Sequence, residues 1–277
     1  ILRNQSYLYY KPDVPVTTSS KESTPYYREY ENSRKSLEEL YELLSQYDVI
    51  SFDIFDTALY RKVEFPNDVF TIMAAEMDHN DFVSVRKTAE RQARDLKEKS
   101  YGTREIILSE IYDILEKYYG IDRSWQQREV ELELDMAEAN SYISAVYRKL
   151  KEEGKTLVFM SDMYLPKQVI LNILNKIGYT GFEKLYLSNE YGLRKGDGKL
   201  QKILLEDYPD KKIIHIGDAK ASDVDKSIEV GLDAFYNPAA NIPFRETDMD
   251  NLAGSFYRSI INRYLNNGVW DKNIFYE

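Results

Sequence analysis

A carboxylate and a hydroxyl form the first pair of residues in this sequence that could do chemistry together. Asp53 follows the apolar run 49–52, and Thr57 comes four residues later. Four consecutive apolar or small residues are typical of a short strand buried on both faces of a parallel sheet. Asp53 would then lie at the carboxyl end of the strand, where open α/β sheets bind their ligands. An acidic turn after a core strand is the alternative for this stretch alone.

Three later strand-like runs are each followed by residues of the same kind. The runs are 156–160, 184–188 and 212–217, and the residues that follow them are Ser161 and Asp162, Lys195, and Asp218 and Asp223. Helical segments with short loops separate these runs, which predicts a parallel sheet with right-handed crossovers. Such a topology brings all of these side chains to one edge of the sheet.

Three aspartates at one edge of a sheet need positive charge among them. Their carboxylates repel one another unless a cation lies between them, and a set of oxygen ligands suits Mg²⁺. The hydroxyls of Thr57 and Ser161, together with Lys195, would offer donors and positive charge to a phosphoryl group. A carboxylate can also attack phosphorus as a covalent nucleophile. The alternative for Lys195 is a surface lysine beside glycines, with Lys199 in its role.

The elements that must position these residues are interrupted by a helical segment. Apolar residues at helical spacing predict helices from Pro66 to Met77, from Phe82 to Lys99 and from Thr103 to Tyr118. A single long helix is expected from Asp122 toward Glu153, where Gly154 ends it. We therefore expect a core formed by residues 47–62 and 151–240, with a helical insertion over residues 63–150, which the resemblance described below identifies as a cap over a catalytic core.

The two ends of the chain are expected to lie outside this core. Residues 1–46 form an N-terminal extension with patches rich in Pro, Ser and Thr, followed by a lead-in helix. Residues 241–277 are expected to contain a helix over 251–266 that leads into a further domain. The sequence starts at Ile1 rather than Met, which favours a piece of a longer polypeptide.

Composition excludes several classes of function. The formal net charge of −10 argues against nucleic acid or anionic membranes as partners, which are bound through Lys and Arg. The basic run from Arg86 to Arg94 is interleaved with acidic residues and is expected to be a solvated helix face. The absence of cysteine excludes disulfides, thiolate metal sites and a cysteine nucleophile. No apolar run approaches the roughly 18 residues of a membrane helix, so we expect a cytoplasmic protein without direct membrane insertion.

Taken together, these residues resemble the haloacid dehalogenase (HAD) superfamily, whose members are mostly phosphatases and phosphotransferases. The resemblance covers roughly residues 48–240. Its four motifs are Phe52-Asp53-Ile-Phe55-Asp56-Thr57, Ser161, Lys195, and Gly217-Asp218-Ala-Lys-Ala-Ser222-Asp223. It implies an α/β fold, a Rossmann-like parallel sheet with helices on both faces, with an inserted α-helical cap. The nearest likeness is to a bacterial subgroup with Phe-Asp-Ile-Phe-Asp-Thr in surface-polysaccharide systems, which implies by analogy fusion to or association with a glycosyltransferase.

The resemblance also implies a role for each site residue. Asp53 would be the nucleophile that forms an aspartyl-phosphate, and Lys195 would offset its repulsion with the incoming phosphate. The residues that would hold the phosphate are Thr57, Ser161 and Lys195. The ligands of Mg²⁺ would be Asp53, Asp218, Asp223 and the backbone carbonyl of Phe55.

One residue departs from the pattern of phosphatases in this superfamily. They usually carry an aspartate, the general acid and base, at the position of Phe55. Asp56 follows, but its side chain is expected to point away from the site. Asp162 is a candidate acid and base, with capping of the following turn as its alternative role. Loss of such a group costs about 10²–10⁴-fold in rate.

Three functions are compatible with this set of residues. The first is a Mg²⁺-dependent phosphatase or phosphotransferase that acts on a small phosphorylated metabolite, such as a sugar phosphate. The second is a catalytically weak phosphate-binding or interaction module within a multidomain polysaccharide-biosynthesis protein, which Phe55 favours. The third is metal-independent dehalogenation, since dehalogenases also have an aromatic residue at the position of Phe55. The presence of both Asp218 and Asp223 argues against this third function.

Overall fold

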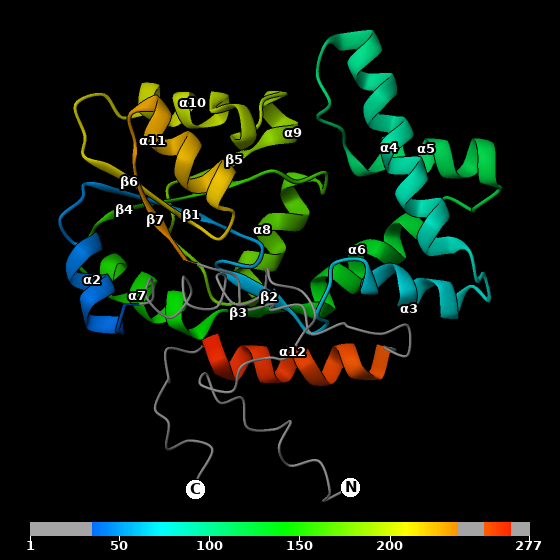
Figure 1. Ribbon diagram of the computed structural model, residues 1–277, viewed down its shortest axis with the longest axis horizontal. Coiled ribbons are helices and arrows are strands. Elements are labelled where there is room, and N and C mark those ends of the chain that lie inside the picture. The colour runs from blue at the N-terminus through cyan, green and yellow to red at the C-terminus, as the bar shows by residue number, and fades with distance from the viewer. Residues whose placement is uncertain (1–34, 238–251, 267–277) are drawn as a thin grey trace, which may run out of the picture.

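The computed structural model describes residues 35–237 and 252–266. Its centre is a five-stranded sheet in the order β5-β4-β1-β6-β7, in which every neighbouring pair is parallel (Figure 1). The strands are β1 (Val49–Asp53), β4 (Thr156–Ser161), β5 (Lys184–Leu187), β6 (Ile213–Gly217) and β7 (Asp233–Tyr236). The Rossmann-like α/β sheet expected from the sequence is therefore confirmed.

Helices cover both faces of the sheet. Successive strand residues point to opposite faces, and all five residues of β1 are buried, so both faces must be covered. Ile50 and Phe52 of β1 belong to a core shared with α2, α7 and α8, whereas Val49 belongs to a second core shared with α10. The helices are α2 (Leu37–Leu44), α7 (Ser141–Glu152), α8 (Lys167–Lys176), α10 (Lys199–Asp207) and α11 (Lys226–Val230). In Figure 1, α10 and α11 lie on the opposite side of the sheet from α2 and α7.

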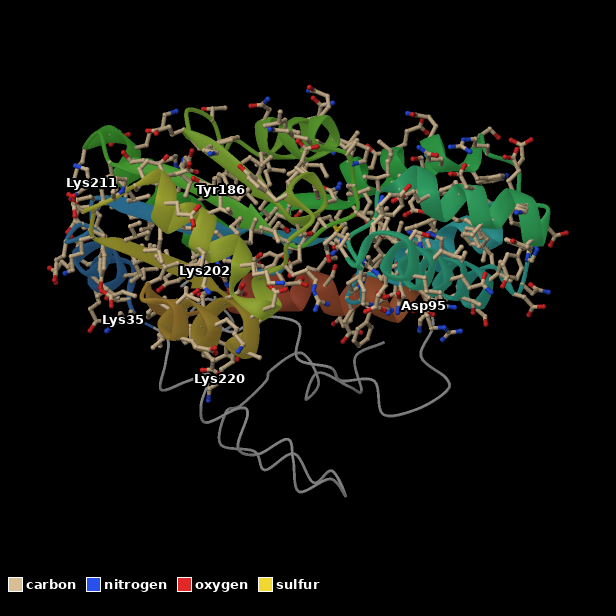
Figure 2. All side chains as sticks on the ribbon, turned by 90° about the horizontal axis from the view of Figure 1, so that it is seen from above. Lys35, Asp95, Tyr186, Lys202, Lys211 and Lys220 are labelled. Atoms are coloured by element: carbon tan, nitrogen blue, oxygen red, sulfur yellow. The ribbon has the colours of Figure 1, made fainter. Side chains whose placement is uncertain are left out.

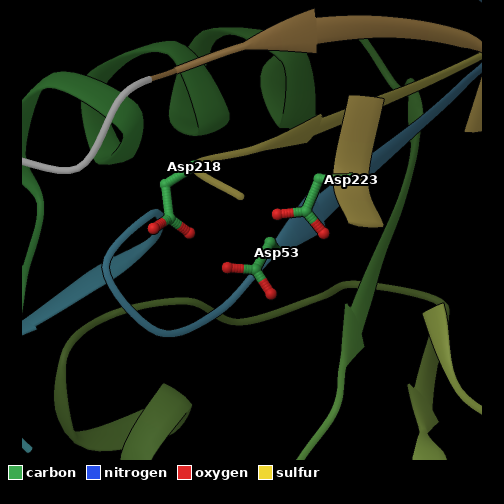
Figure 3. Close-up of side chains that lie close together, drawn as sticks. All are labelled: Asp53, Asp218 and Asp223. Carbon is green, nitrogen blue, oxygen red and sulfur yellow. The ribbon is translucent and has the colours of Figure 1, made fainter. Parts of the chain in front are cut away.

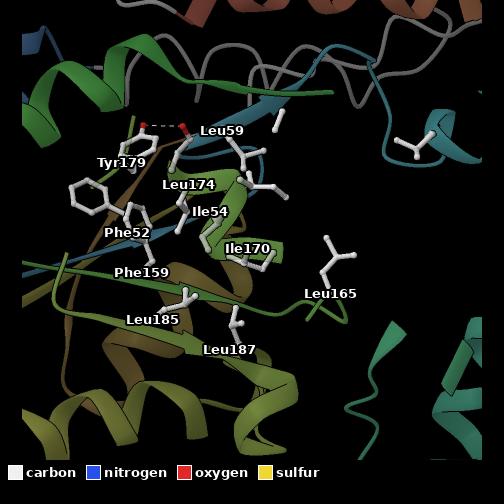
Figure 4. Close-up of a cluster of buried hydrophobic side chains, with 14 of the residues drawn as sticks. Phe52, Ile54, Leu59, Phe159, Leu165, Ile170, Leu174, Tyr179, Leu185 and Leu187 are labelled. Atoms are coloured by element: carbon white, nitrogen blue, oxygen red, sulfur yellow. Dashed lines mark hydrogen bonds between the residues drawn. The ribbon is translucent and has the colours of Figure 1, made fainter. Parts of the chain in front are cut away.

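An aromatic cluster holds β1 in place on the first of these faces (Figure 4). The ring of Phe159 lies 5.9 Å from that of Phe52 and 5.4 Å from that of Tyr179, measured between centroids. Complete burial of a side chain such as Phe contributes about 1.5–3 kcal/mol. The Tyr179 hydroxyl donates to the carbonyl of Ala58 at 2.8 Å, so the cluster also fixes the backbone that follows the strand.

The helical segment beside the sheet is built from α3 (Asp68–Glu76), α4 (Phe82–Tyr101), α5 (Leu108–Tyr119) and α6 (Trp125–Met136). The single helix expected from Asp122 toward Glu153 is wrong. The chain leaves the helix at β3 (Ala137–Ala139), which pairs antiparallel with β2 (Leu59–Arg61). Asn140 then caps α7 by accepting the N–H of Tyr142 at 3.1 Å, and its Nδ2 donates to the carbonyl of Thr57 at 2.7 Å.

The division into core and cap stays a proposal, although packing bears on its boundary. Helix α7 contacts both α2 and β4 and belongs to the core of the sheet. The four helices α3 to α6 contact one another. The contacts favour an end of the cap at β3 rather than at residue 150.

A buried ion pair holds this helical segment together. Arg86 and Glu129 are both fully buried, with Nη2 and Oε1 2.7 Å apart, and the Tyr112 hydroxyl donates to Glu129 at 2.9 Å. The expected solvated face over the basic run is therefore wrong at Arg86. The spacing of charges could not reveal its partner, because Glu129 comes from another helix.

The C-terminal helix α12 (Leu252–Asn266) agrees with the one expected over 251–266 and contacts α3. The Ser255 hydroxyl accepts the N–H of Glu64 at 2.8 Å. Of the expected extension and lead-in helix over residues 1–46, residues 1–34 lie outside the described residues, and α2 agrees with the expected lead-in helix. In Figure 2, Lys202 of α10 lies on the side of the five-stranded sheet and Asp95 of α4 on the side of the helical segment. No helix in the described ranges has both the length and the apolar character needed to cross a membrane.

Candidate active site

Three aspartates converge at the carboxyl edge of the sheet (Figure 3). Asp53 ends β1, Asp218 follows β6, and Asp223 lies in η3 (Lys220–Asp225), a short π-helical segment. One carboxylate oxygen from each lies within 4.8 Å of the others. Asp53 is 4% exposed and Asp223 is completely buried. Parallel strand topology is the cause of this convergence, as the sequence predicts.

Lys195 joins two of these carboxylates. Its Nζ lies 2.5 Å from Oδ1 of Asp53 and 2.7 Å from Oδ1 of Asp223, and the residue is 5% exposed. Lys199 has an exposed side chain whose Nζ lies 3.6 Å from Asp197. The structure therefore places Lys195 at the site and Lys199 on the surface.

The backbone around Lys195 is fixed by side chains from two other segments. Lys195 begins η2 (Lys195–Asp197), and its N–H donates to Oδ1 of Asp162 at 2.9 Å. Its carbonyl accepts from Nε2 of Gln201 at 3.2 Å, and Gln201 also donates to the carbonyl of Ser222 at 2.9 Å. Asp162 thus touches the Lys195 loop directly, and its role as acid and base stays a prediction.

Asp223 is oriented by contacts on both oxygens. Its Oδ2 accepts the N–H of Ala219 at 3.0 Å, while Oδ1 lies 3.4 Å from Nε2 of the buried His215. Nδ1 of His215 lies 2.8 Å from the hydroxyl oxygen of Ser51. A Cβ at Gly217 would overlap the Asp223 carboxylate, so the glycine is needed for this approach. The sequence reasoning missed His215, although its place in β6 beside Asp218 is a usable signal.

Burial and mutual repulsion set the protonation of the carboxylates. Burial raises the pKa of Asp53 to about 6, against the attraction of Lys195. Burial and the charge of Asp53 also raise the pKa of Asp218. For Asp223, burial is outweighed by Lys195 and His215, and its pKa is lowered. Burial opposes the charge on Lys195, but Asp53 and Asp223 outweigh it and raise the pKa of the ammonium. The lysine therefore stays charged.

The two hydroxyls assigned to phosphate lie in different environments. Ser161 ends β4, is 2% exposed and lines the pocket above the aspartates. Thr57 is completely buried and is not among the pocket-lining residues; its hydroxyl donates to Oδ1 of Asp218 at 3.2 Å. Phosphate binding by Thr57 and Ser161 stays a prediction, with the pocket favouring Ser161.

The pocket has a volume of about 320 Å³ and includes residues that the sequence reasoning missed. Its lining comprises Asp53, Phe55, Asp56, Arg61, Pro66, Ser161, Asp162, Met163, Tyr164, Lys195, Asp218, Ala219, Ser222 and Asp223. Asp56, whose side chain the sequence predicts to point elsewhere, is among these lining residues. Its φ of 59° is left-handed, and this turn of the backbone brings Asp56 to the pocket wall. Burial raises the pKa of Asp56, and the charge of Arg61 opposes this effect.

The donor set fits a hard divalent cation. The carboxylate oxygens of Asp53, Asp218 and Asp223 are close enough to share one ion. Burial, and after it the charge of neighbouring aspartates, raises the pKa of Asp53 and Asp218, and such an ion would offset both effects. The chain contains no cysteine, and His215 is already engaged by Ser51 and Asp223. An all-oxygen site of this kind suits Mg²⁺ rather than a softer metal.

No family model matches the sequence, and a search of curated proteins gave no match. Solved structures do match. A HAD-family enzyme from Bacteroides thetaiotaomicron has a TM-score of 0.51 at 16% identity, covering 73% of this chain and 96% of that chain. An L-2-haloacid dehalogenase has a TM-score of 0.51 at 14% identity, covering 79% of this chain and 99% of that chain. At such identities the similarity concerns the fold, which is HAD-like as the sequence predicts.

Proposed function

We propose that this protein, whose core has the HAD-like fold, is a Mg²⁺-dependent phosphatase or phosphotransferase. Its substrate would be a small phosphorylated metabolite, and the reaction would pass through an aspartyl-phosphate. The observation that carries the proposal is the position of Lys195, which contacts Asp53 and Asp223 at 2.5 and 2.7 Å inside an acidic pocket. A fixed ammonium beside a carboxylate that ends a strand supplies a charge partner for both nucleophile and phosphate.

The covalent steps use groups that the chain provides. An oxygen of Asp53 attacks phosphorus, the bond from phosphorus to the leaving oxygen breaks, and the leaving group takes a proton from solvent. Water then attacks the aspartyl-phosphate, which releases inorganic phosphate and a proton and restores the carboxylate. An alcohol in place of water gives transfer. Lys195 and Ser161 would hold the phosphoryl oxygens, with Thr57 acting on Asp218.

A bound Mg²⁺ would neutralise charge on the phosphoryl group and on the aspartates. The groups that would hold it are Asp53, Asp218, Asp223 and the backbone carbonyl of Phe55. The contacts of His215 and Ala219 with Asp223 would keep that carboxylate turned toward the site.

Phe55 predicts which step is slow. Phe55 lines the pocket, and the resemblance to HAD phosphatases assigns a general acid and base to its position. Breakdown of the aspartyl-phosphate needs a base to activate water, so this step should suffer most, by about 10²–10⁴-fold. Substrates whose leaving group needs no protonation, such as acyl phosphates, should be affected least in the first step.

A screen of phosphorylated metabolites with and without Mg²⁺ tests the proposal. Phosphate release that requires Mg²⁺ and disappears in Asp53→Asn supports it. A matched control is Asp207→Asn, because Asp207 lies in α10 and its carboxylate pairs with Lys184 on the surface. Halide release from 2-haloacids without metal would support dehalogenation and reject the proposal.

A phosphate-binding module with little catalytic power is the second candidate, and Phe55 is the observation that favours it. It differs from the first in predicting Mg²⁺ and phosphate binding without any phosphorylated Asp53. A place in surface-polysaccharide biosynthesis, association with a glycosyltransferase and a cytoplasmic location stay predictions from the sequence. Copurification with a glycosyltransferase from the source cells would test the association.

A further inference from the structure

The pocket has a second polar wall, formed by Asp56 and Arg61, which the phosphoryl-transfer steps do not use. Both residues line the pocket. Arg61 ends β2 and is 6% exposed. Its Nε and Nη2 donate to Glu133 of α6 at 3.0 and 3.3 Å. Among the described residues, no partner bonds Nη1, which leaves this nitrogen as a donor for a ligand.

Arg61 is held on a second side by the aromatic ring of Phe55. The guanidinium carbon lies 4.5 Å from the ring centroid. A guanidinium that both lies over a ring and pairs with a carboxylate has little freedom to move. Phe55 therefore has a use beyond the absence of a catalytic aspartate, because it is the platform that fixes Arg61 at the pocket wall.

The charges of this wall decide what it can bind. The positive charge of Arg61 is offset by the buried Glu133, and Asp56 adds a negative charge. From the residues that the structure describes, a second anionic group on the substrate would thus meet no excess positive charge at this wall. A hydroxyl group is suited to the pair, since it can accept from Nη1 of Arg61 and donate to Asp56 at the same time. A carboxylate has about four acceptor sites, so Asp56 can take such a bond in addition to others.

The size of the pocket limits the rest of the ligand. A volume of about 320 Å³ lies at the lower end of the range for small-molecule sites, about 300–1,000 Å³. After the phosphoryl group, the space suits a single small carbon skeleton better than a nucleotide or a polymer.

We propose that Arg61 and Asp56 are specificity-determining residues that select a leaving group bearing hydroxyls, a phosphorylated polyol or monosaccharide, over phosphate esters without hydroxyls. This inference rests on the proposed function. The alternative is a purely structural role for Arg61, in which its ion pair with Glu133 holds β2 against α6 and Arg61 does not contact the substrate.

Matched substrates test the inference in the wild-type protein with Mg²⁺. Glycerol 3-phosphate is compared with propyl phosphate, and glucose, mannose and galactose 6-phosphates with cyclohexylmethyl phosphate. We expect kcat/KM to be about tenfold or more higher for a hydroxylated member, mainly through KM, as a hydrogen bond to a charged group provides. 3-Phosphoglycerate, which has a carboxylate in place of the terminal CH₂OH, should be used less well than glycerol 3-phosphate.

Variants of Asp56 and Arg61 then test whether these two residues cause the preference for hydroxylated substrates. Asp56→Asn keeps the left-handed backbone accessible and should reduce the ratio of kcat/KM between the hydroxylated and plain members toward one. Arg61→Lys, which keeps the charge opposite Glu133, should reduce it as well. Asp210→Asn is the control. Asp210 also has a left-handed φ, 63°, but it precedes β6 and so lies near the amino ends of the strands, opposite the site.

The outcomes separate this inference from the proposed function. Turnover of plain and hydroxylated esters at equal kcat/KM overturns the inference alone, as does a preference for 3-phosphoglycerate. Equal loss on both members in Asp56→Asn would place Asp56 in the chemistry and overturn its recognition role. No Mg²⁺-dependent turnover of any ester in the panel would overturn the proposed function and the inference with it.

Discussion

The ammonium nitrogen of Lys195 lies 2.5 Å from Oδ1 of Asp53, although the two residues are 142 positions apart in the sequence. Both side chains are 6% exposed. Removal of one partner from a buried ion pair costs about 3–5 kcal/mol, because the other charge is left without compensation. Single substitutions that break this ion pair should therefore have large effects, which makes the roles assigned to Lys195 and Asp53 testable.

Asp53→Asn should abolish turnover of any phosphorylated substrate, by roughly 10⁴-fold or more, because an amide cannot form the acyl phosphate. Asp56→Asn should have a much smaller effect on kcat, since Asp56 lines the wall beside Arg61 rather than ending β1. Steady-state kinetics of both variants, with circular dichroism to check folding, decide the matter. Equal loss of kcat in the two variants would mean that the nucleophile or the acid and base has been misplaced.

Lys195→Met should lower kcat/KM by about 10²–10³-fold, as expected for removal of one preorganised donor to a transition state. It should also weaken phosphate binding, measured by calorimetry, because Asp53 and Asp223 would repel the anion. Lys199→Met is the matched control: the same substitution four residues away, on a side chain that is 60% exposed. Similar losses in both variants would reject the assignment of Lys195.

The sheet and the convergence of the aspartates could be predicted from the sequence because they follow from local patterns. Apolar runs that end at Asp53 and before Asp218 define parallel strands, and topology places their ends together. The sequence favours Lys195 over Lys199 without deciding between them. The structure distinguishes the two, because Lys195 is buried and the side chain of Lys199 is exposed.

Features that depend on distant partners could not be predicted. The apolar periodicity continues through β3, and nothing local shows that Ala137–Ala139 pairs with β2. Arg86 was misjudged because its partner, Glu129, lies on another helix. The place of Asp56 in the pocket wall goes with a left-handed backbone conformation, which Asp tolerates but which its residue type does not reveal in a sequence. Arg61 needed both β2 and the pocket to be known before it could be seen as a site residue.

Mg²⁺ should stabilise the protein more at neutral than at acidic pH. The pKa of Asp53 is raised to about 6, above its usual value of 3.8. Its contribution to the free energy of unfolding is therefore complete below about pH 3.8 and is lost as the pH rises through 6. Asp223, with its pKa lowered, loses its contribution only below pH 3.8, outside this window. Bound Mg²⁺ needs ionised carboxylates and offsets the loss.

The measurement is the rise in Tm caused by Mg²⁺ at about pH 5 and at about pH 7.5, with the larger rise expected at the higher pH. Calorimetry in buffers of different ionisation enthalpy should show proton release on binding at the lower pH. An equal or larger rise at about pH 5 would contradict the protonation of Asp53 derived from its burial.

Asp162 should act by positioning Lys195 rather than by proton transfer. Its Oδ1 accepts the N–H of Lys195 at 2.9 Å, and an asparagine retains that oxygen. Asp162→Asn should therefore keep most of the activity and its pH profile, whereas Asp162→Ala should lower kcat/KM by about tenfold through loss of the hydrogen bond. If both variants lose activity equally, together with one limb of the pH–rate profile, Asp162 is the acid and base after all.

Phe55→Asp tests what the aromatic residue does to the reaction. In the wild type, water attack on the aspartyl-phosphate lacks a base, so acid-trapped phosphoprotein should accumulate and a burst should precede steady turnover. The new carboxylate would stand beside Arg61, whose guanidinium lies 4.5 Å from the present ring, and would stay ionised. An ionised carboxylate can serve as the base of the second step but is a poor acid for the first. We therefore expect faster breakdown of the phosphoprotein, by about 10²-fold, with little gain in its formation.

Phe55→Leu is the control for Phe55→Asp, because it removes the platform under Arg61 without adding a carboxylate. It should leave phosphoprotein breakdown slow while reducing the preference for hydroxylated substrates, and rapid-quench kinetics separate the two effects. Phosphoprotein in neither the wild type nor Phe55→Asp would favour the phosphate-binding module, since no nucleophilic step would then occur. A fast wild-type enzyme without detectable phosphoprotein would contradict both readings, because the base that Phe55 cannot supply would have to come from another side chain at the pocket wall, with Asp56 and Asp162 as the carboxylates in place.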